Sequence, residues 1–182
     1  MTVKTENQIW ADVFQILNGI LETKNITGWK IRQGNQPTME GLKSGSVYIT
    51  RIGSRRYGWQ AHKSVWNETE GKMIQQEQYF QEVLFQISAF KKRNPADITE
   101  MTSGDLLNSF ITFLQSIAGV KALQSLGYQT FRIQELREPT ISNDSDLYEK
   151  LPSFDISLIL VQNEECETGH TDKLNLTQMK GI

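Results

Sequence analysis

The sequence predicts an α+β domain with a mostly antiparallel or mixed sheet of about four to five strands and amphipathic helices packed on one face. Two observations predict this fold class. Apolar residues recur at helical spacing in two long segments, and several shorter segments alternate their side chains or are rich in β-branched and aromatic residues. Turn signals separate the first strand-like segments, which favours antiparallel neighbours. The predicted order is α-β-β-β-α-α-β-β.

The N-terminal segment predicts a helix. Residues Thr5-Glu6-Asn7-Gln8 have the form of a capping box, in which the Thr and Gln side chains bond free backbone N–H groups. Apolar residues then follow at helical spacing from Ile9 to Leu21, a stripe wide enough to face a core. We expect the helix to end near Thr23. A connection rich in glycine follows, with a short strand at residues 29–31.

The next segment predicts three further strand-like runs. Residues 47–52 ("VYITRI") alternate their side chains and are rich in β-formers. Gly53-Ser54 is a turn signal, and residues 57–66 read as the returning strand of a hairpin. Residues 78–90 ("QYFQEVLFQISAF") form a third, longer run.

The second half predicts two helices and two strands. Thr102-Ser103-Gly104-Asp105 is a helix start signal before an amphipathic segment, and a short helix through residues 120–126 is expected to end at Gly127. Residues 128–136 and 154–162 read as strands on either side of a polar loop. Residues 1–162 are therefore expected to form one domain. Residues 163–182 read as a polar tail, of the kind that either orders on a partner or stays solvated.

The composition and motifs exclude several function classes. The formal charge of −2 does not favour general affinity for nucleic acid. The single cysteine, Cys166, lies among glutamates, which would raise a thiol pKa and suppress its nucleophilicity. Neither His62 nor His170 has a partner at metal-ligand spacing. We therefore expect no enzyme, no cofactor, no metal and no membrane segment.

One short stretch stands out by its residue types. "RIGSRRYGWQ" holds positive charges and aromatic rings, and no acidic residue lies between Ser46 and Trp66. Such residues suit partner contacts, in which arginine and aromatic residues are enriched, and they also suit a solvated hairpin or single-stranded nucleic acid. Partner contact is the favoured reading. The candidate interface is Arg51, Arg55, Arg56, Tyr57 and Trp59.

The long strand also has an apolar second face. Phe80, Leu84 and Phe90 alternate with the residues expected to face the core. Because this face is too apolar for plain contact with water, we predict that a neighbouring subunit partly covers it.

Six sequence features follow one another in a distinctive order and spacing over about residues 6 to 162. They are "DVFQILNGIL", "SVYITRI", "EVLFQISAF", "DLLNSFITFLQS", the arginine at 137 and "FDISLIL".

This layout resembles the tail terminator, or neck terminator, family of tailed bacteriophages, especially those with contractile tails. The resemblance implies a structural virion protein without an active site. Its copies would form a hexameric ring that caps the tail tube, stops tube and sheath polymerisation, and provides the docking surface for the neck connector. The expected partners are therefore further copies, the tube protein, the sheath protein and the connector.

The resemblance also implies a location and a route for DNA. The protein would lie at the tail–neck junction of the virion, after assembly in the host cytoplasm. DNA would pass through the ring without specific binding, and acidic residues near the lumen would prevent sticking by like-charge repulsion. The candidates are Asp144 and Asp146 in the polar loop, or the acidic residues of the C-terminal tail. The alternatives are another neck adaptor, such as a tail-completion or head-closure protein, and a single-strand nucleic-acid-binding module.

Overall fold

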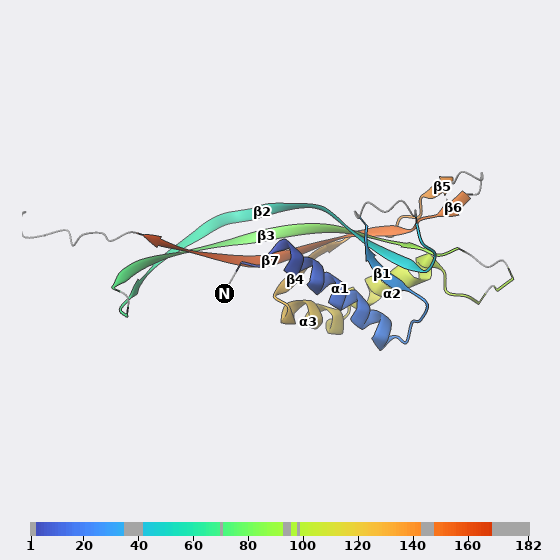
Figure 1. Cartoon of the computed structure of the whole chain (residues 1–182), viewed down its shortest axis with the longest axis horizontal. Coiled ribbons are helices and arrows are strands. Elements are labelled where there is room, and N and C mark those ends of the chain that lie inside the picture. The colour runs from blue at the N-terminus through green and yellow to red at the C-terminus, as the bar shows by residue number, and fades with distance from the viewer. Residues whose placement is uncertain are drawn as a thin grey trace, which may run out of the picture.

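The computed structural model describes residues 3–34, 42–69, 71–92, 96–97, 99–142 and 148–168, and its elements are arranged as in Figure 1. The helices are α1 (Glu6–Thr23), α2 (Ser103–Gln115) and α3 (Ile117–Ser125). The strands are β1 (Lys30–Gln33), β2 (Ser46–Asn67), β3 (Lys72–Phe90), β4 (Tyr128–Ile133), β5 (Thr140–Ser142), β6 (Tyr148–Lys150) and β7 (Ser153–Thr168).

The main sheet is mixed and has the strand order β1-β2-β3-β7-β4. Strand β1 pairs with β2 in parallel, and all the other neighbours in this sheet are antiparallel. Strands β5 and β6 form a separate antiparallel pair. The three helices lie on one side of the main sheet (Figure 1). The α+β prediction is therefore confirmed, including the helix layer on one face.

Both long helices begin at capping boxes. The Thr5 hydroxyl accepts a bond from the backbone N–H of Gln8, and the Gln8 side chain accepts from the backbone N–H of Thr5. Thr102 and Asp105 make the same reciprocal pair at the start of α2. The helices then bury their apolar stripes against the sheet. The fully buried side chains of this core include Leu17, Ile20, Ile49, Phe85, Ile87, Leu106, Leu107, Phe110, Leu114, Leu123, Tyr128 and Phe154.

Helices α2 and α3 meet at a sharp bend. Their axes differ by 73° across the break at Ser116, which caps the start of α3. A Cβ atom at Gly119 would lie 2.1 Å from the carbonyl oxygen of Phe113, so only glycine fits this approach without a shift. No single helix in the described ranges is long and apolar enough to cross a membrane; α2 and α3 pass that test only as a bent pair, by length and composition.

The predicted hairpin turn at Gly53-Ser54 is wrong. Both residues pair with β3, opposite Leu84 and Val83, and β2 runs through them as one strand. Gly53 marks a β-bulge instead, since the register shifts between Arg51 and Gly53. Its φ is not in the left-handed region that a tight two-residue turn requires. Glycine inside a strand commonly signals a bulge rather than a reversal.

The chain reverses later than predicted. The link between β2 and β3 includes Gly71, whose φ of +61° suits glycine. Strand β3 therefore begins at Lys72 rather than at residue 78.

The last strand is also longer than predicted. Strand β7 continues to Thr168, so residues 163–168 of the expected tail belong to the sheet. Residues 163–168 carry no apolar alternation in the sequence, and their ladder to β3 places them in the sheet. The polar loop before β7 contains the β5–β6 pair. Residues 169–182 lie outside the described ranges.

Candidate assembly surfaces

A three-stranded arm extends beyond the helix layer (Figure 1). We define the arm as residues 61–67 of β2, 72–78 of β3 and 163–168 of β7, which pair in continuous register. At about 3.3 Å per residue, its β2 segment spans roughly 20 Å. No described side chain in the arm is buried, in contrast to the strand segments beneath the helices.

The arm is polar along its length and apolar near its end. Polar and charged residues occupy most of its positions. At the end, Trp66 is opposite Met73 and Val65 is opposite Ile74 across the β2–β3 pair. Trp66 is 55% exposed. Tryptophan and methionine are enriched in protein interfaces, so the end of the arm has the composition of a contact site.

Arg51 lies opposite Phe85 in the body, Arg55 lies opposite Glu82 nearer the arm, and each pairs with a glutamate. Arg51 bonds Glu6 at the start of α1 at 2.7 Å, and this ion pair lowers the pKa of Glu6. Arg55 bonds Glu82 through Nε. A hydrogen bond from Ser157 to Glu82, and then the bond from Arg55, lower the pKa of Glu82. Each guanidinium therefore already has a carboxylate partner in its own chain.

Arg56 lies on the opposite face of the sheet from Arg55, the face that also carries Arg51. Its guanidinium carbon lies 4.2 Å from the centre of the Tyr79 ring, and a terminal nitrogen lies 3.9 Å from Glu164. The Tyr79 hydroxyl donates to the same Glu164 carboxylate at 3.0 Å. Burial and this hydrogen bond raise the pKa of Tyr79. The group fixes the start of the arm, where β2, β3 and β7 leave the helix-covered sheet.

The other predicted partner residues are placed only in part. Tyr57 and Trp59 lie within β2, and the register shifts between Tyr57 and Ala61, around Gly58 with its φ of +75°. The structure describes their backbone and not their side chains. Asp144 and Asp146 lie outside the described ranges. The assignment of these four residues to interfaces stays a prediction.

The three residues predicted to form a subunit interface lie in different environments. Phe80 is 40% exposed and is opposite Val161, which is 39% exposed. Leu84 is half-buried on the same face of β3. Phe90, at the far end of β3 from the arm, is buried within its own chain. A neighbouring copy could therefore contact Phe80 directly, with Val161 beside it, and Leu84 in part.

A polar hollow of about 410 Å³ lies on the face of the sheet away from the helices. Arg55 and Ser54 flank it from β2, and Arg132 flanks it from β4. Its floor includes Glu82 on β3 and Asp155 on β7, both buried. Asp155 accepts a 2.7 Å bond from Arg137.

Sequence reasoning missed this hollow. Arg132 and Asp155 are sequence-distant, and only the strand order places their strands side by side. The available signal was the alternation of polar residues through Asp155 and Ser157 in an otherwise apolar strand. The structure brings Arg55 to this group and keeps Arg51 and Arg56 away from it.

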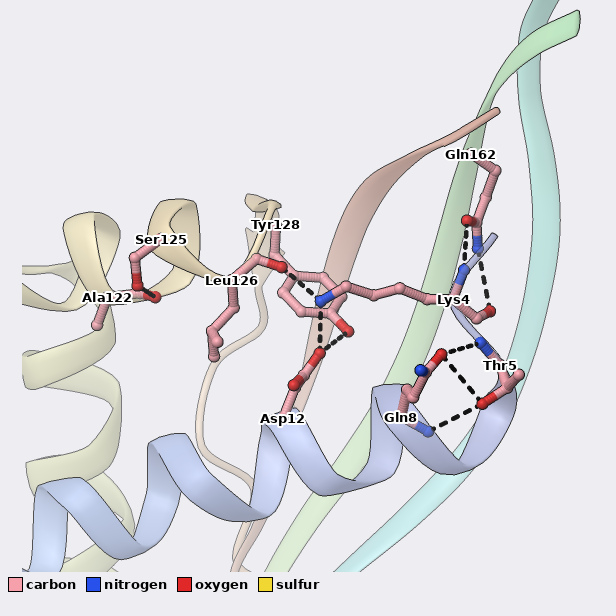
Figure 2. A network of polar contacts seen from close by, with 9 residues as sticks. All are labelled: Lys4, Thr5, Gln8, Asp12, Ala122, Ser125, Leu126, Tyr128 and Gln162. Atoms are coloured by element: carbon pink, nitrogen blue, oxygen red, sulfur yellow. Dashed lines mark hydrogen bonds and ion pairs between the residues drawn. The ribbon is translucent and has the colours of Figure 1, made fainter. Parts of the chain in front are cut away.

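The N-terminus is fixed beside the base of the arm (Figure 2). Lys4 Nζ bonds Asp12 at 2.6 Å and the backbone oxygen of Leu126, and it lies 4.3 Å from the centre of the Tyr128 ring. The buried Tyr128 hydroxyl donates to the same Asp12 carboxylate, and burial together with this bond raises the pKa of Tyr128. The buried Gln162 side chain accepts from the backbone N–H of Lys4. These bonds join α1 to β4 and β7.

The described residues contain no group of three or more His, Cys, Asp or Glu side chains arranged to hold a metal ion. The second concave region, about 380 Å³, lies where α2 begins and is lined by Lys91, Lys92 and Lys150. Lys91 and Lys150 already pair with Glu100 and Glu138.

The chain matches one family model and is similar in fold to solved structures. The model of the family described as E217 gateway protein gp29 matches residues 8–170. The chain is also similar in fold to a sheath/tube terminator, in the extended state, of the extracellular contractile injection system PVC. That alignment has a TM-score of 0.53 and 13% identity. It covers 93% of this chain and 60% of the other, so this chain spans about three-fifths of that protein's length.

No curated protein matches the chain significantly in sequence. The family match nevertheless extends from α1 into the residues after β7, and therefore includes the helix layer, the main sheet and the arm. The resemblance to phage tail terminators is thereby confirmed, and the chain belongs to the family of the E217 gateway protein gp29.

Proposed function

We propose that this protein is a structural component of the phage virion that acts as a tail terminator. Copies of the chain form a ring, hexameric as the tail terminator family implies, on the last ring of the tail tube. The ring stops further polymerisation of tube and sheath and offers its opposite surface to the neck connector. The role requires shape and surface chemistry and no catalysis.

The observation that carries this proposal is the projecting arm. A ribbon in which no described side chain is buried gains little from its own chain, because short strand ribbons are marginally stable without a packed face. Its apolar end adds exposed surface that a partner could cover. An element of this kind suits an assembly protein, and the fold is shared with a sheath/tube terminator.

The shape also suits a ring. A head-to-tail contact between unlike surfaces generates a closed ring if the rotation closes, and an open filament if it does not. This chain has two unlike ends, a polar arm and a helix-covered body (Figure 1). Ring closure leaves the two ring faces to meet different neighbours, which is what a terminator between tube and connector requires.

The paired arginines disfavour the nucleic-acid alternative. A single-strand binder exposes unpaired cations and stacking rings along one groove. Here Arg51, Arg55 and Arg56 each lie against a glutamate of the same chain. We therefore expect DNA to pass through the ring without specific binding. Contact of these arginines with a subunit or partner stays a prediction. Asp144 and Asp146 remain the candidate lumen residues.

The direct test is to delete the gene and examine the particles by electron microscopy. Loss of a terminator should give tails of uncontrolled length without attached heads, and the cloned chain should restore normal tails. In the restored particles, the chain should form a ring at the junction of tail and neck. Tails of normal length that fail to join heads would overturn the terminator role and favour the other neck adaptor.

A second test separates the arm from the body. Deleting the end of the β2–β3 hairpin should leave a folded chain that no longer restores tails. A charge reversal on the helix layer, Lys121→Glu, serves as the control because Lys121 is exposed on α3. Full restoration by the shortened chain would remove the arm from the proposal.

A further inference from the structure

Both edges of the arm are open. Strand β1 covers the outer edge of β2 only at residues 46–49, and β4 covers the outer edge of β7 only as far as Leu160. In the part of the chain that the structure describes, no strand pairs with the outer edge of β2 at residues 61–67 or of β7 at residues 163–168. Each edge therefore offers backbone N–H and C=O groups to a further strand.

The two open edges match in length and direction. Strands β2 and β7 both pair antiparallel with β3, so they run parallel to each other, and their arm segments lie opposite the same residues 72–78 of β3. Because β3 lies between them, they cannot pair within one chain. In two copies related by a rotation, the β7 edge of one copy can pair with the β2 edge of the next in parallel, as β1 pairs with β2 in the body.

The two edges carry opposite charge. Residues 163–168 ("NEECET") contain three glutamates and no lysine or arginine, whereas residues 61–67 ("AHKSVWN") contain Lys63 and no acidic residue. Lys63 is exposed and has no ion-pair partner among the described residues. Pairing two β7 edges would bring glutamates together, and pairing two β2 edges would bring lysines together, both of which are unfavourable. The charges therefore favour the pairing of unlike edges.

The strand register places the complementary residues on one face of the arm. Lys63 and Glu165 are both opposite Gln76, and Glu167 lies two positions further along β7. Positions two apart in a strand share a face, so all three of these charged residues belong to the same face. A neighbouring copy in the same orientation brings its Lys63 to the face that carries Glu165 and Glu167.

We propose that the arms of successive copies pair edge to edge, with residues 163–168 of one copy bonded in parallel to residues 61–67 of the next. The contact joins two unlike edges and is therefore head-to-tail, as ring closure requires. Repeated around the ring, it joins all the arms into one closed sheet without a free edge. This inference rests on the proposed function and names the contact that builds its ring.

A second copy suits these edges better than a strand of an unlike partner. Every copy supplies both the acidic edge and the edge with Lys63, equal in extent and with the charged positions on one face. One kind of contact therefore satisfies every arm edge in the ring. A strand from a tube or sheath protein would cover one edge of each arm and leave the other open.

Disulfide trapping tests the contact directly. Cys166 and Ser64 are both opposite Gln75, and two strand spacings, about 10 Å, separate them within one chain, which is too far for a disulfide. In tails that carry Ser64→Cys, mild oxidation should link successive copies into a ladder of covalent oligomers. His62→Cys and Trp66→Cys lie on the same face and test a register shifted by two residues in either direction.

The matched controls lie on the other face of the arm. Ala61→Cys and Val65→Cys place the new thiol on the face away from Cys166 and should give little ladder. Ser64→Cys combined with Cys166→Ser should give none. Equal linking from both faces, or linking of the new thiol to a tube or sheath protein in place of a second copy, would overturn the edge contact.

A charge swap tests the chemistry of the contact, measured by titrating the chain onto tails that lack it. Lys63→Glu should weaken association about fivefold, as expected for a partly exposed ion pair. Glu165→Lys with Glu167→Lys should weaken it similarly, and combining these changes with Lys63→Glu should recover most of the loss. No recovery, or an equal loss in the control Lys121→Glu on α3, would contradict the pairing of these charges.

Electron microscopy of the same tails separates the two possible failures. A ring that forms and yields no ladder from residues 62, 64 or 66 would overturn edge pairing while leaving the terminator role intact. A chain that forms no ring, either alone or on purified tails, would overturn both.

Discussion

The two ends of the main sheet are stabilised in different ways. In the body, the strands lie under three helices, and central side chains such as Phe85 are fully buried. In the arm, the same three central strands continue with polar side chains on both faces, and Trp66 near the end is 55% exposed. The comparison shows that the same three paired strands can form part of a buried core at one end and an exposed surface at the other.

The largest expected effect lies in the body. Phe85→Ala removes a fully buried ring that packs edge-on against Trp10, with 5.4 Å between the ring centres. Such a truncation should lower the free energy of unfolding by about 3–5 kcal/mol. Trp66→Ala is the matched change in the arm and should cost under about 1 kcal/mol, since exposed sites contribute little. Urea unfolding checks both values, and equal losses would contradict the comparison.

A smaller effect is expected where the arm meets the body. Tyr128→Phe removes the hydroxyl that donates to Asp12, while Lys4 still pairs with that carboxylate. Losing a hydrogen bond to a charged group should cost about 1–3 kcal/mol of unfolding free energy. An unchanged unfolding midpoint would show that the N-terminal anchor of Figure 2 does not stabilise the body.

The smallest effect concerns pH. The folded state lowers the pKa of Glu82 below its ordinary value of 4.5, through Ser157 first and Arg55 second. The stabilisation is therefore present above that value and is lost as the pH falls through the lowered pKa. We expect the difference in unfolding midpoint between the natural chain and Glu82→Gln to shrink between about pH 7 and about pH 3. A constant difference would contradict the role of the carboxylate charge.

The body could be predicted from sequence because its signals are local. The capping boxes at Thr5 and Thr102 and the apolar stripes that follow them give the helices almost to the residue. The apolar run at the start of β7 likewise gives a buried strand. An element with one buried face has apolar residues at regular spacing in the sequence, and this spacing predicts the element.

The arm could not be predicted because its strands lack a regular spacing of apolar residues. None of its described side chains is buried, and residues 72–77 and 163–168 carry no alternation of apolar and polar side chains. Gly53 was misread because a glycine in a strand-like run serves a turn or a bulge equally well, and only pairing with Leu84 decides between them. The hollow depends on strand order, which joins Arg55, Glu82, Asp155 and Arg132 from distant segments.

Hydrogen exchange, followed by mass spectrometry in the isolated chain and in the chain bound to tails, tests the division between body and arm most directly. We predict that amides of the body, such as those around Phe85 and Phe154, are protected in both states. Amides of residues 61–67 and 163–168 should exchange faster in the isolated chain and become protected on assembly. Arm amides as protected as the body in the isolated chain, or equally fast before and after assembly, would contradict the account.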